Sequence, residues 1–546
     1  MGHLSRRALA LALIAWLLVA CTSQLPPLPS FSRTGPVQGG QVVEAIAGTA
    51  GPLNPLFEQE DNEKDIDSVI YQGLTTVGAN EQVTGLLARD WKVSSDGLTY
   101  TFDLRSGVRW ADGQPFTADD VMFTFGVLQS PDYQQATDQD WKEIQIQKTG
   151  KLQVEFTLKA PSASFPLALR QGIIARHLFQ DIRVLNMAAS ARSAGQALGT
   201  GPFKVGGISP DRHEVALDRN PYANPAPNLD HLVFRTYPSL ADAIDAVSRG
   251  EADSAGELAL PNISTLAKRQ DLALLQRQTF SFASVLFNLN PDQSTFFAQP
   301  AVRQALTQAV DRDTIVKSVL DGRADPAPGP IPPSDWAFSR QAAGKLGFNR
   351  AKAAQTLQQA GWTMNMQTGV LSRAGRDFSV TLVTAAASPY LQVAQAISDQ
   401  LRLVGVQVHV EPVPASVLVS KYLIGKRYQM ALAAFDNGPD PDQYSFWHSG
   451  ATTDSLNFTA QDRLPKQALI DKDLEDGRAS TDINARKAAY QDFQDLMSDA
   501  APAIFVFEPH YTYVVSRRIL GLRVNRVIEP VDRFEYVADW YVTRGG

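Results

Sequence analysis

A run of short polar residues, prolines and one glycine follows a strand that we expect over Tyr428 to Phe435. The run reads Phe435-Asp436-Asn437-Gly438-Pro439-Asp440-Pro441-Asp442. A carboxylate at the end of a buried strand, here Asp436, could hold an ammonium group by a charge-assisted hydrogen bond, and excluding water would strengthen it. The alternative is that Asp436 caps a turn, which residues of these types commonly do. A calcium loop fits poorly, because the glycine and prolines interrupt the ligand spacing.

The rest of the sequence gives little support for catalysis. Gly199-Thr200-Gly201 runs into Pro202, so it is no phosphate-binding loop at a helix start. A Ser-His-Asp triad stays open, since its members need not be adjacent, but no nucleophile elbow supports one. The histidines show no metal-ligand pair at short spacing, and no cysteine joins them. The sequence therefore predicts no catalytic residue, no metal and no cofactor.

A group of acidic residues near position 475 is interpreted as a solvated helix face. Asp476 stands where a calcium loop would require glycine. The group consists of Asp471, Asp473, Glu475, Asp476 and Asp482.

The N-terminus resembles an export signal that ends at a lipidated cysteine. Arg6 and Arg7 precede an apolar run, Ala8 to Ala20, that is too short to span a bilayer but suits a secretory signal. Leu18-Val19-Ala20-Cys21 resembles a lipobox, and Cys21 is the only cysteine in the chain. We expect a signal peptide over residues 1–20 and lipidation at Cys21. The alternatives are an ordinary signal with an incidental cysteine and, from Ser5-Arg6-Arg7, twin-arginine export.

Residues 21–40 are rich in proline, serine and glycine and are expected to form a flexible, lipid-anchored tether, although a merely disordered N-terminus would look the same. The formal net charge of −7 argues against a nucleic-acid partner and against a polybasic membrane surface. The body that follows exceeds one ordinary core, so two or three lobes are expected. No later apolar run reaches membrane-spanning length. Contact with the membrane is therefore expected through the N-terminal lipid only, and we expect a monomer.

Strand and helix patterns alternate along the body, which indicates a mixed α/β fold. Strands are predicted at Gln41–Ala47, Val154–Leu158, His231–Tyr237, Val406–Val410, Tyr428–Phe435 and, as a short buried strand, Ala503–Phe507. Helices are predicted at Leu240–Arg249, Pro300–Leu320, Tyr390–Val404 and Arg486–Ala500.

The most specific stretch of the sequence runs from Leu87 to Phe125. Tyr100, Phe102 and Leu104 alternate with polar residues as in a half-buried strand, and Thr117 with Asp120 predicts a capping-box helix start. The amino-acid sequence of the whole stretch resembles the signature of the peptide-binding family of ABC-transporter solute receptors, the dipeptide- and oligopeptide-binding proteins. That resemblance implies a receptor that captures a ligand rather than an enzyme.

The resemblance extends over almost all of the chain after the tether. Further matching segments are Gly199–Phe203, Phe287–Asn290, Ala301–Ile315, Phe348–Trp362 and Leu403–Val406. It implies a two-lobed, Venus-flytrap, periplasmic-binding-protein fold of the α/β class with an extra inserted subdomain. Lobe I would comprise residues 41–285 plus 505–546, with the insert at about 81–195, and lobe II residues 286–504.

The same resemblance implies a ligand site. In dipeptide-binding relatives, an aspartate before Asn-Gly pairs with the ligand's α-amino group, and Asp436 stands at that position. Those relatives have an arginine for the ligand carboxylate just before a Pro-Tyr pair, whereas this chain has Ser388 there, so strict dipeptide specificity is in doubt. Longer peptides or a cationic non-peptide solute would fit better. The residues expected to bind ligand are Ala434, Phe435, Asp436, Asn437, Ser388 and Asn288.

Three classes of function follow. The leading one is an exported, lipid-anchored receptor of an ABC importer that faces the periplasm or the extracellular side. Its partners would be a peptide or another small-molecule ligand and the permease and ATPase subunits. The second is a sensing receptor without a transporter, since one fold can serve either role. The third is an exported hydrolase.

Replacement of Cys21 tests the anchor. We expect Cys21→Ala to move the protein from the membrane to the soluble fraction with its ligand affinity unchanged, because the chain has no other thiol to lipidate. Fractionation followed by immunoblotting measures this. Equal membrane retention of the variant and the wild type would contradict lipidation at this residue.

Overall fold

The protein is described from a computed structural model. It describes residues 36–58, 60–78, 82–135, 141–256, 263, 265–451 and 464–543. The predicted signal peptide and Cys21 lie outside these residues. Of the predicted tether, residues 36–40 are described and have no regular secondary structure, and the first strand begins at Gln41.

The largest element of the fold is a 12-stranded mixed sheet. Its strand order is β19-β18-β20-β13-β21-β11-β1-β10-β9-β8, and β12 and β14 each also pair with β21. The strands are β1 (Gln41–Ala47), β8 (Phe203–Ile208), β9 (Glu214–Arg219), β10 (His231–Tyr237), β11 (Ser254–Gly256), β12 (Leu272–Gln278), β13 (Ser281–Phe287), β14 (Ala324–Pro326), β18 (Ser379–Ala385), β19 (Gln407–Val413), β20 (Met430–Asp436) and β21 (Ala503–Ser516).

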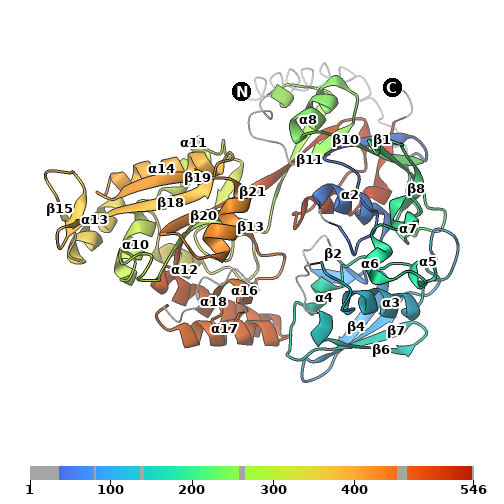
Figure 1. Cartoon of the computed structure of the whole chain (residues 1–546), viewed down its shortest axis with the longest axis horizontal. Helices are drawn as coiled ribbons and strands as arrows, with labels where there is room; N and C mark the ends of the chain where they lie inside the picture. The colour runs from blue at the N-terminus through green and yellow to red at the C-terminus, as the bar shows by residue number, and fades with distance from the viewer. Residues whose placement is uncertain are drawn as a thin grey trace, which may run out of the picture. The chain divides into compact units, whose positions relative to one another are not determined.

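One strand, β21, belongs to both halves of this sheet. Its first half pairs antiparallel with β13 and β14, and its second half pairs antiparallel with β11 and β12. Figure 1 shows β21 running between β13 and β11. The predicted strand 503–507 is therefore too short, since β21 has 14 residues. Glu508, Pro509 and His510 interrupt the apolar run, yet all three continue the ladders with β12 and β14.

The hydrophobic core separates into clusters on either side of that strand. Two clusters contain residues between Val42 and Leu272 together with Tyr511 to Val542, and we call the elements around them lobe I. Two others contain residues between Phe282 and Phe507, and their elements form lobe II. The chain crosses between the lobes along β21 and also at Thr279 and Phe280, which join β12 to β13.

Lobe I includes a four-stranded antiparallel sheet, in the order β4-β5-β7-β6, that lies within the predicted insert. Its strands are β4 (Ala88–Val93), β5 (Thr99–Leu104), β6 (Gln145–Gly150) and β7 (Gln153–Thr157). The helix α3 (Ala118–Leu128) begins with the predicted capping box of Thr117 and Asp120, which is confirmed. The remaining elements of lobe I are α2 (Asp61–Ile70), β2 (Thr75–Val77), β3 (Val83–Gly85), η1 (Trp141–Glu143), α4 (Phe165–Ala168), α5 (Arg176–Phe179), α6 (Val184–Met187), α7 (Ala191–Ala194), α8 (Leu240–Arg249), β22 (Ile519–Leu520), η3 (Pro530–Phe534), η4 (Val537–Asp539) and β23 (Tyr541–Val542).

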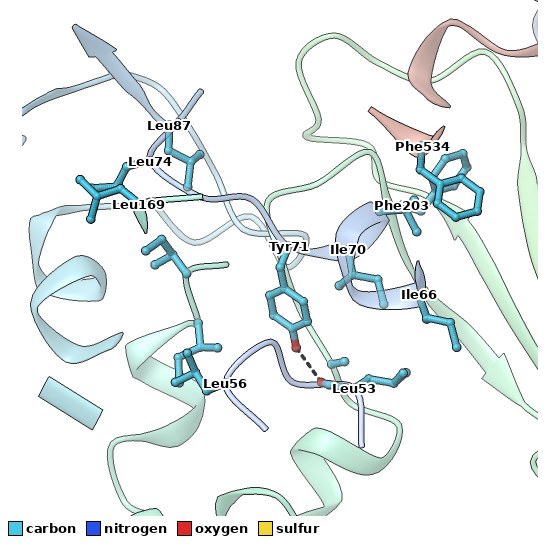
Figure 2. Close-up of a cluster of buried hydrophobic side chains, with 14 of the residues drawn as sticks. Leu53, Leu56, Ile66, Ile70, Tyr71, Leu74, Leu87, Leu169, Phe203 and Phe534 are labelled. Atoms are coloured by element: carbon cyan, nitrogen blue, oxygen red, sulfur yellow. Dashed lines mark hydrogen bonds between the residues drawn. The ribbon is translucent and has the colours of Figure 1, made fainter. Parts of the chain in front are cut away.

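The insert shares a core with the rest of lobe I. Figure 2 shows Leu87 and Leu169 of the insert in the same cluster as Ile70 of α2 and Phe534 of η3. In the middle of this cluster the Tyr71 hydroxyl donates to the Leu53 carbonyl at 3.0 Å. The insert is therefore packed onto lobe I as part of one core, not attached by a linker.

Lobe II is covered mainly by helices. They are α10 (Pro300–Ala309), α11 (Arg312–Ser318), α12 (Arg340–Lys345), α13 (Arg350–Gln359), α14 (Tyr390–Arg402), α15 (Ala415–Val417), the π-helix η2 (Leu418–Ile424), α16 (Tyr444–Trp447), α17 (Gln467–Ala479) and α18 (Ile483–Ala500). A small hairpin sheet comprises β15 (Thr363–Met364), β16 (Leu371–Arg373) and β17 (Arg376–Asp377).

Most of the predicted elements are confirmed, and one helix is corrected. The predictions for β1, β10 and α8 match their bounds. The single helix predicted over Pro300–Leu320 is wrong, because it breaks into α10 and α11. Val310 has extended backbone there, and the Asp311 carboxylate accepts the Thr314 N–H at 3.1 Å as the N-cap of a new helix.

A buried glutamate lies beside an arginine where the chain crosses between the lobes. Glu508 of β21 is fully buried, and its carboxylate lies 4.0 Å from the guanidinium of Arg526. The Arg526 Nε donates to the Thr279 carbonyl at 3.0 Å, and the guanidinium stacks over Phe280 at 3.7 Å. The Ser334 hydroxyl of lobe II also donates to Glu508, at 3.4 Å. Burial raises the pKa of Glu508 to about 8, although Arg526 opposes the shift.

We expect this glutamate to make stability depend on pH. Its folded pKa of about 8 lies above the ordinary 4.5, so between these values the folded state holds a proton that the unfolded state has released. Its contribution to stability is thus present below pH 4.5 and is lost as pH rises towards 8. Glu508→Gln should flatten the wild-type fall of unfolding free energy, by at most about 1.4 kcal/mol per pH unit. Urea unfolding between pH 5 and 8 measures this. Equal slopes in the two proteins would contradict the assignment, and Glu60→Gln, on an exposed side chain, serves as the control.

Candidate functional site

The alternation of side chains along β20 determines which of its residues can meet a ligand. Ala434 and Asp436 are exposed on one face of the strand, whereas Phe435 between them is only 4% exposed. The Phe435 ring packs against Phe282 and Phe446, each at 5.8 Å between centroids. Its side chain therefore belongs to the core of lobe II and not to the surface that carries Asp436.

The backbone of β20 extends beyond one of its neighbours. The parallel register with β18 ends at Thr384 opposite Leu432, while β13 pairs along the other edge as far as Ser281 opposite Asp436. The edge from Ala433 to Asp436 is thus not covered by β18. An uncovered strand edge beside an exposed carboxylate can accept an extended peptide by adding a strand to the sheet.

Asp436 is the unpaired acid of its loop. Asp440 is bound by Arg486 at 2.6 and 2.8 Å, and Asp442 by Arg478 at 2.7 Å. Within the described residues, no cationic side chain lies within salt-bridge distance of Asp436, which accepts a hydrogen bond from the Ser281 hydroxyl. A carboxylate left without a counter-charge suits an incoming ammonium group.

The charges around Asp436 come from both lobes. Although Asp436 is exposed on its face of β20, the surrounding protein displaces enough water from its carboxyl that desolvation is the main cause that raises its pKa, and the Ser281 hydrogen bond opposes this. Glu529 and Asp61 of lobe I raise this pKa further, and Lys64 lowers it. Lys64 itself pairs with Glu529 at 2.8 Å. The pKa of Asp436 in lobe II therefore depends on charged side chains of α2 and of the residue before η3, both in lobe I.

The Ser388 segment precedes a helix whose first residue, Tyr390, is affected by the charge of Asp436. Ser388 is exposed in the turn that precedes α14. Two residues further on, burial raises the pKa of the Tyr390 hydroxyl, and the charge of Asp436 raises it further. The start of α14 is therefore within electrostatic range of the carboxylate, as expected if this segment and β20 share a site.

Asn437 and Asn288 have structural partners. The Asn437 N–H donates to the Phe280 carbonyl at 3.2 Å and its side-chain amide to the Pro330 carbonyl at 3.1 Å, which holds the loop against lobe II. Asn288 is buried beyond the opposite end of β13, where it donates to the Lys426 carbonyl at 2.9 Å. It lies roughly 20 Å along the strand from Ser281, at about 3.3 Å per residue. The structure does not bring Asn288 together with Asp436.

Several residues of this site were not predicted from the sequence. Only the tertiary fold brings Asp436 close to Ser281, Lys64 and Glu529. The arginines that bind the other aspartates of the loop, Arg478 and Arg486, come more than 35 positions after it in the sequence. Among the residues that the structure describes, no group of three or more His, Cys, Asp or Glu side chains is placed to hold a metal ion. No helix in the same residues is long and apolar enough to cross a membrane.

The family of the chain follows from its similarity to known proteins. Residues 82–457 match the model of "Bacterial extracellular solute-binding proteins, family 5 Middle", and the chain belongs to this family. This confirms the resemblance to the peptide-binding receptors of ABC transporters. The family is one of solute-binding proteins rather than enzymes.

Individual relatives cover nearly the whole chain. The oligopeptide-binding protein AppA of Bacillus subtilis is 26% identical over 538 residues, which cover 96% of this chain and 97% of AppA. The dipeptide-binding protein of Escherichia coli is 25% identical over 533 residues, covering 92% and 94%.

Solved structures show the same fold. The structure of B. subtilis AppA in complex with a nonapeptide matches with a TM-score of 0.72 at 25% identity, over 93% of this chain and all of that one. Listeria monocytogenes CtaP matches with a TM-score of 0.77 at 22% identity, covering 93% and 100%. The two-lobed α/β fold of solute-binding proteins is thereby confirmed.

The Ser281 hydroxyl gives a direct test of the environment of Asp436. It donates to the carboxylate and so favours the charged form. Ser281→Ala should raise the pKa of Asp436 above its wild-type value, whereas Ser281→Thr keeps a hydroxyl and should change it less. Carboxyl-carbon NMR titration measures the pKa, and Asp436→Asn assigns the resonance. An unchanged pKa in the alanine variant would show that this hydrogen bond does not form in solution.

Proposed function

We propose that this protein is the substrate-binding lipoprotein of an ABC importer, which captures peptides or a related amino-bearing solute between its lobes and delivers them to a membrane permease. The observation that carries this proposal is Asp436, which forms no salt bridge with the described residues and is exposed at the end of β20, beside a strand edge that β18 leaves unpaired. The carboxylate would hold the ligand's ammonium group, and the strand edge its backbone. No residue of the site is assigned a catalytic role.

The lobes are proposed to close over the ligand. Lobe I supplies Lys64 and Glu529 near Asp436, so a bound solute would contact both lobes only when they approach each other. Hydrophobic side chains of 282–287 and 503–507 pack in lobe II, and those of 511–515 in lobe I. This supports lobe boundaries near residues 280 and 509, a few residues from the expected 285 and 505.

The ligand is proposed to be longer than a dipeptide. Ser388 stands where the resemblance to dipeptide binders expects a carboxylate-binding arginine, and a hydroxyl offers one neutral donor in place of a charged fork. The relative B. subtilis AppA was solved with a nonapeptide. Export and anchoring through Cys21 complete the proposal, because a tethered receptor can reach both its solute and a permease.

Replacement of Asp436 tests the anchor for the ammonium group. Asp436→Asn keeps the shape of the side chain and removes its charge. We expect a pool of synthetic nonapeptides with free amino termini to bind the variant about 30- to several-thousand-fold more weakly, the usual effect of losing one partner of a desolvated charge pair. The same pool after N-acetylation should bind the wild type weakly and the variant no worse.

Calorimetry with both pools measures the four affinities. Asp292→Asn makes the same chemical change at an exposed turn beyond the other end of β13 and should leave binding unaltered. If Asp436→Asn binds the free-amine pool within about threefold of the wild type, Asp436 is a turn cap and the anchor lies elsewhere.

A further inference from the structure

The lobes also touch at a place distant in sequence from β21 and from the β12–β13 crossing. The Ala163 N–H, in the insert of lobe I, donates to the carbonyl of Arg478 in the last turn of α17 of lobe II, at 2.9 Å. The insert segment is itself held in place, because the Tyr100 hydroxyl of β5 donates to the Ser162 carbonyl at 2.7 Å. We call this contact between Ala163 and Arg478 the rim contact.

The side chain of Arg478 points from this contact to the loop of Asp436. Its Nε donates to Asp442 at 2.7 Å, and its guanidinium stacks over the Tyr444 ring at 4.1 Å. The Asp442 side chain is only 9% exposed, and its other oxygen accepts the Tyr444 N–H at 3.0 Å. One residue thus joins the rim contact, through its backbone, to the loop, through its side chain.

A second arginine ties the same helix end to the same loop. Arg486 of α18 binds both oxygens of Asp440 and donates from its Nε to the carbonyl of Gly477, the residue before Arg478. The Arg486 and Asp440 side chains are 9% and 18% exposed, where a charge-assisted pair is stronger than at an open surface. Two arginine–aspartate pairs therefore tie the end of α17 to the Asp436 loop.

We propose that Arg478 is a positioning residue that couples docking of the insert onto lobe II to the orientation of the Asp436 loop. When the rim contact forms, it fixes the end of α17. The arginine pairs of Asp440 and Asp442 then fix the loop that also carries Asp436. When it breaks, the end of α17 loses this hydrogen bond to the insert and the loop loses one of its restraints. The link to ligand rests on the proposed function, whereas the rim contact itself does not.

The rim contact is tested without ligand. Ala163→Pro removes the donor N–H while leaving lobe II unchanged. Nitroxide labels at Lys92→Cys and Ala488→Cys, both exposed, would report the distance between the insert and α18 in a Cys21→Ala background that has no other cysteine. We expect Ala163→Pro to increase the population at long distances roughly 2- to 10-fold, as for the loss of one hydrogen bond. An unchanged distance distribution would overturn the rim contact.

The coupling to the loop is tested by a double-mutant cycle. Arg478→Gln keeps the backbone acceptor and breaks the bond to Asp442, and Asp442→Asn weakens the same bond from the other side. With the free-amine nonapeptide pool, Ala163→Pro should lower affinity several-fold in the wild-type background and much less in the Arg478→Gln background. Asp442→Asn should add little to Arg478→Gln. Additive effects would overturn the positioning role.

The distance measurement and the affinity measurement distinguish a wrong rim contact from a wrong ligand class. If no nonapeptide binds the wild type, the proposed ligand class is wrong, while the label distances still decide the rim contact. Circular dichroism of each variant checks its folding. Should Ala163→Pro fail to fold, Tyr100→Phe, which removes the hydrogen bond to Ser162, replaces it, with the same shift to long distances expected and an unchanged distribution again contradicting the contact.

Discussion

The architecture depends on one strand that completes every part of the core. Side chains of β21 occur in all four hydrophobic clusters of the described residues: Ile504 and Phe505 in lobe II, and Tyr513 and Val514 in lobe I. An extended strand hardly lengthens, so the lobes can rotate about β21 by twisting it but cannot separate along it. The same strand that holds the lobes together thus limits how they move.

This constraint explains the different behaviour expected at the two ends of the site. Ser281, the partner of Asp436, follows the crossing residues Thr279 and Phe280 directly, so it lies close to the axis of any rotation. Because Ser281 and Asp436 are ladder partners within lobe II, a rotation of the lobes does not by itself break their hydrogen bond. The rim contact of Ala163 with Arg478 is made by segments of the insert and of α17, remote in sequence from the crossing strands, and a rotation about β21 would act on it directly.

Local sequence patterns predicted much of the secondary structure and the family. The Thr117–Asp120 capping box and the alternation along β5 are decided by neighbours in sequence, so both could be predicted. The break at Val310–Asp311 was missed because the apolar spacing of α10 continues across it. The extension of β21 through Pro509 was missed because its ladder partners are distant in sequence.

In the site, too, features set by neighbours in sequence could be predicted, and features set by residues distant in sequence could not. Asp436 could be singled out from its loop, but the burial of Phe435 follows from the register of β20 with β13, and the position of Asn288 from the length of that pairing. The counter-charges of Asp440 and Asp442 come from Arg486 and Arg478, and no pattern within the loop indicates them. Which aspartate stays unpaired is therefore a property of the tertiary structure.

The position of β21 also has a consequence for biosynthesis. Because this strand begins at residue 503, a ribosome must make all the preceding elements before either lobe can receive its central strand. Until then the edges of β13 and β11 that pair with β21 have no partner. The hydrogen bond from Tyr513 to Glu44, 469 residues apart in sequence, also cannot form. The growing polypeptide thus stays incompletely folded until this strand is made, and the apolar surface exposed in such a state is what chaperones bind.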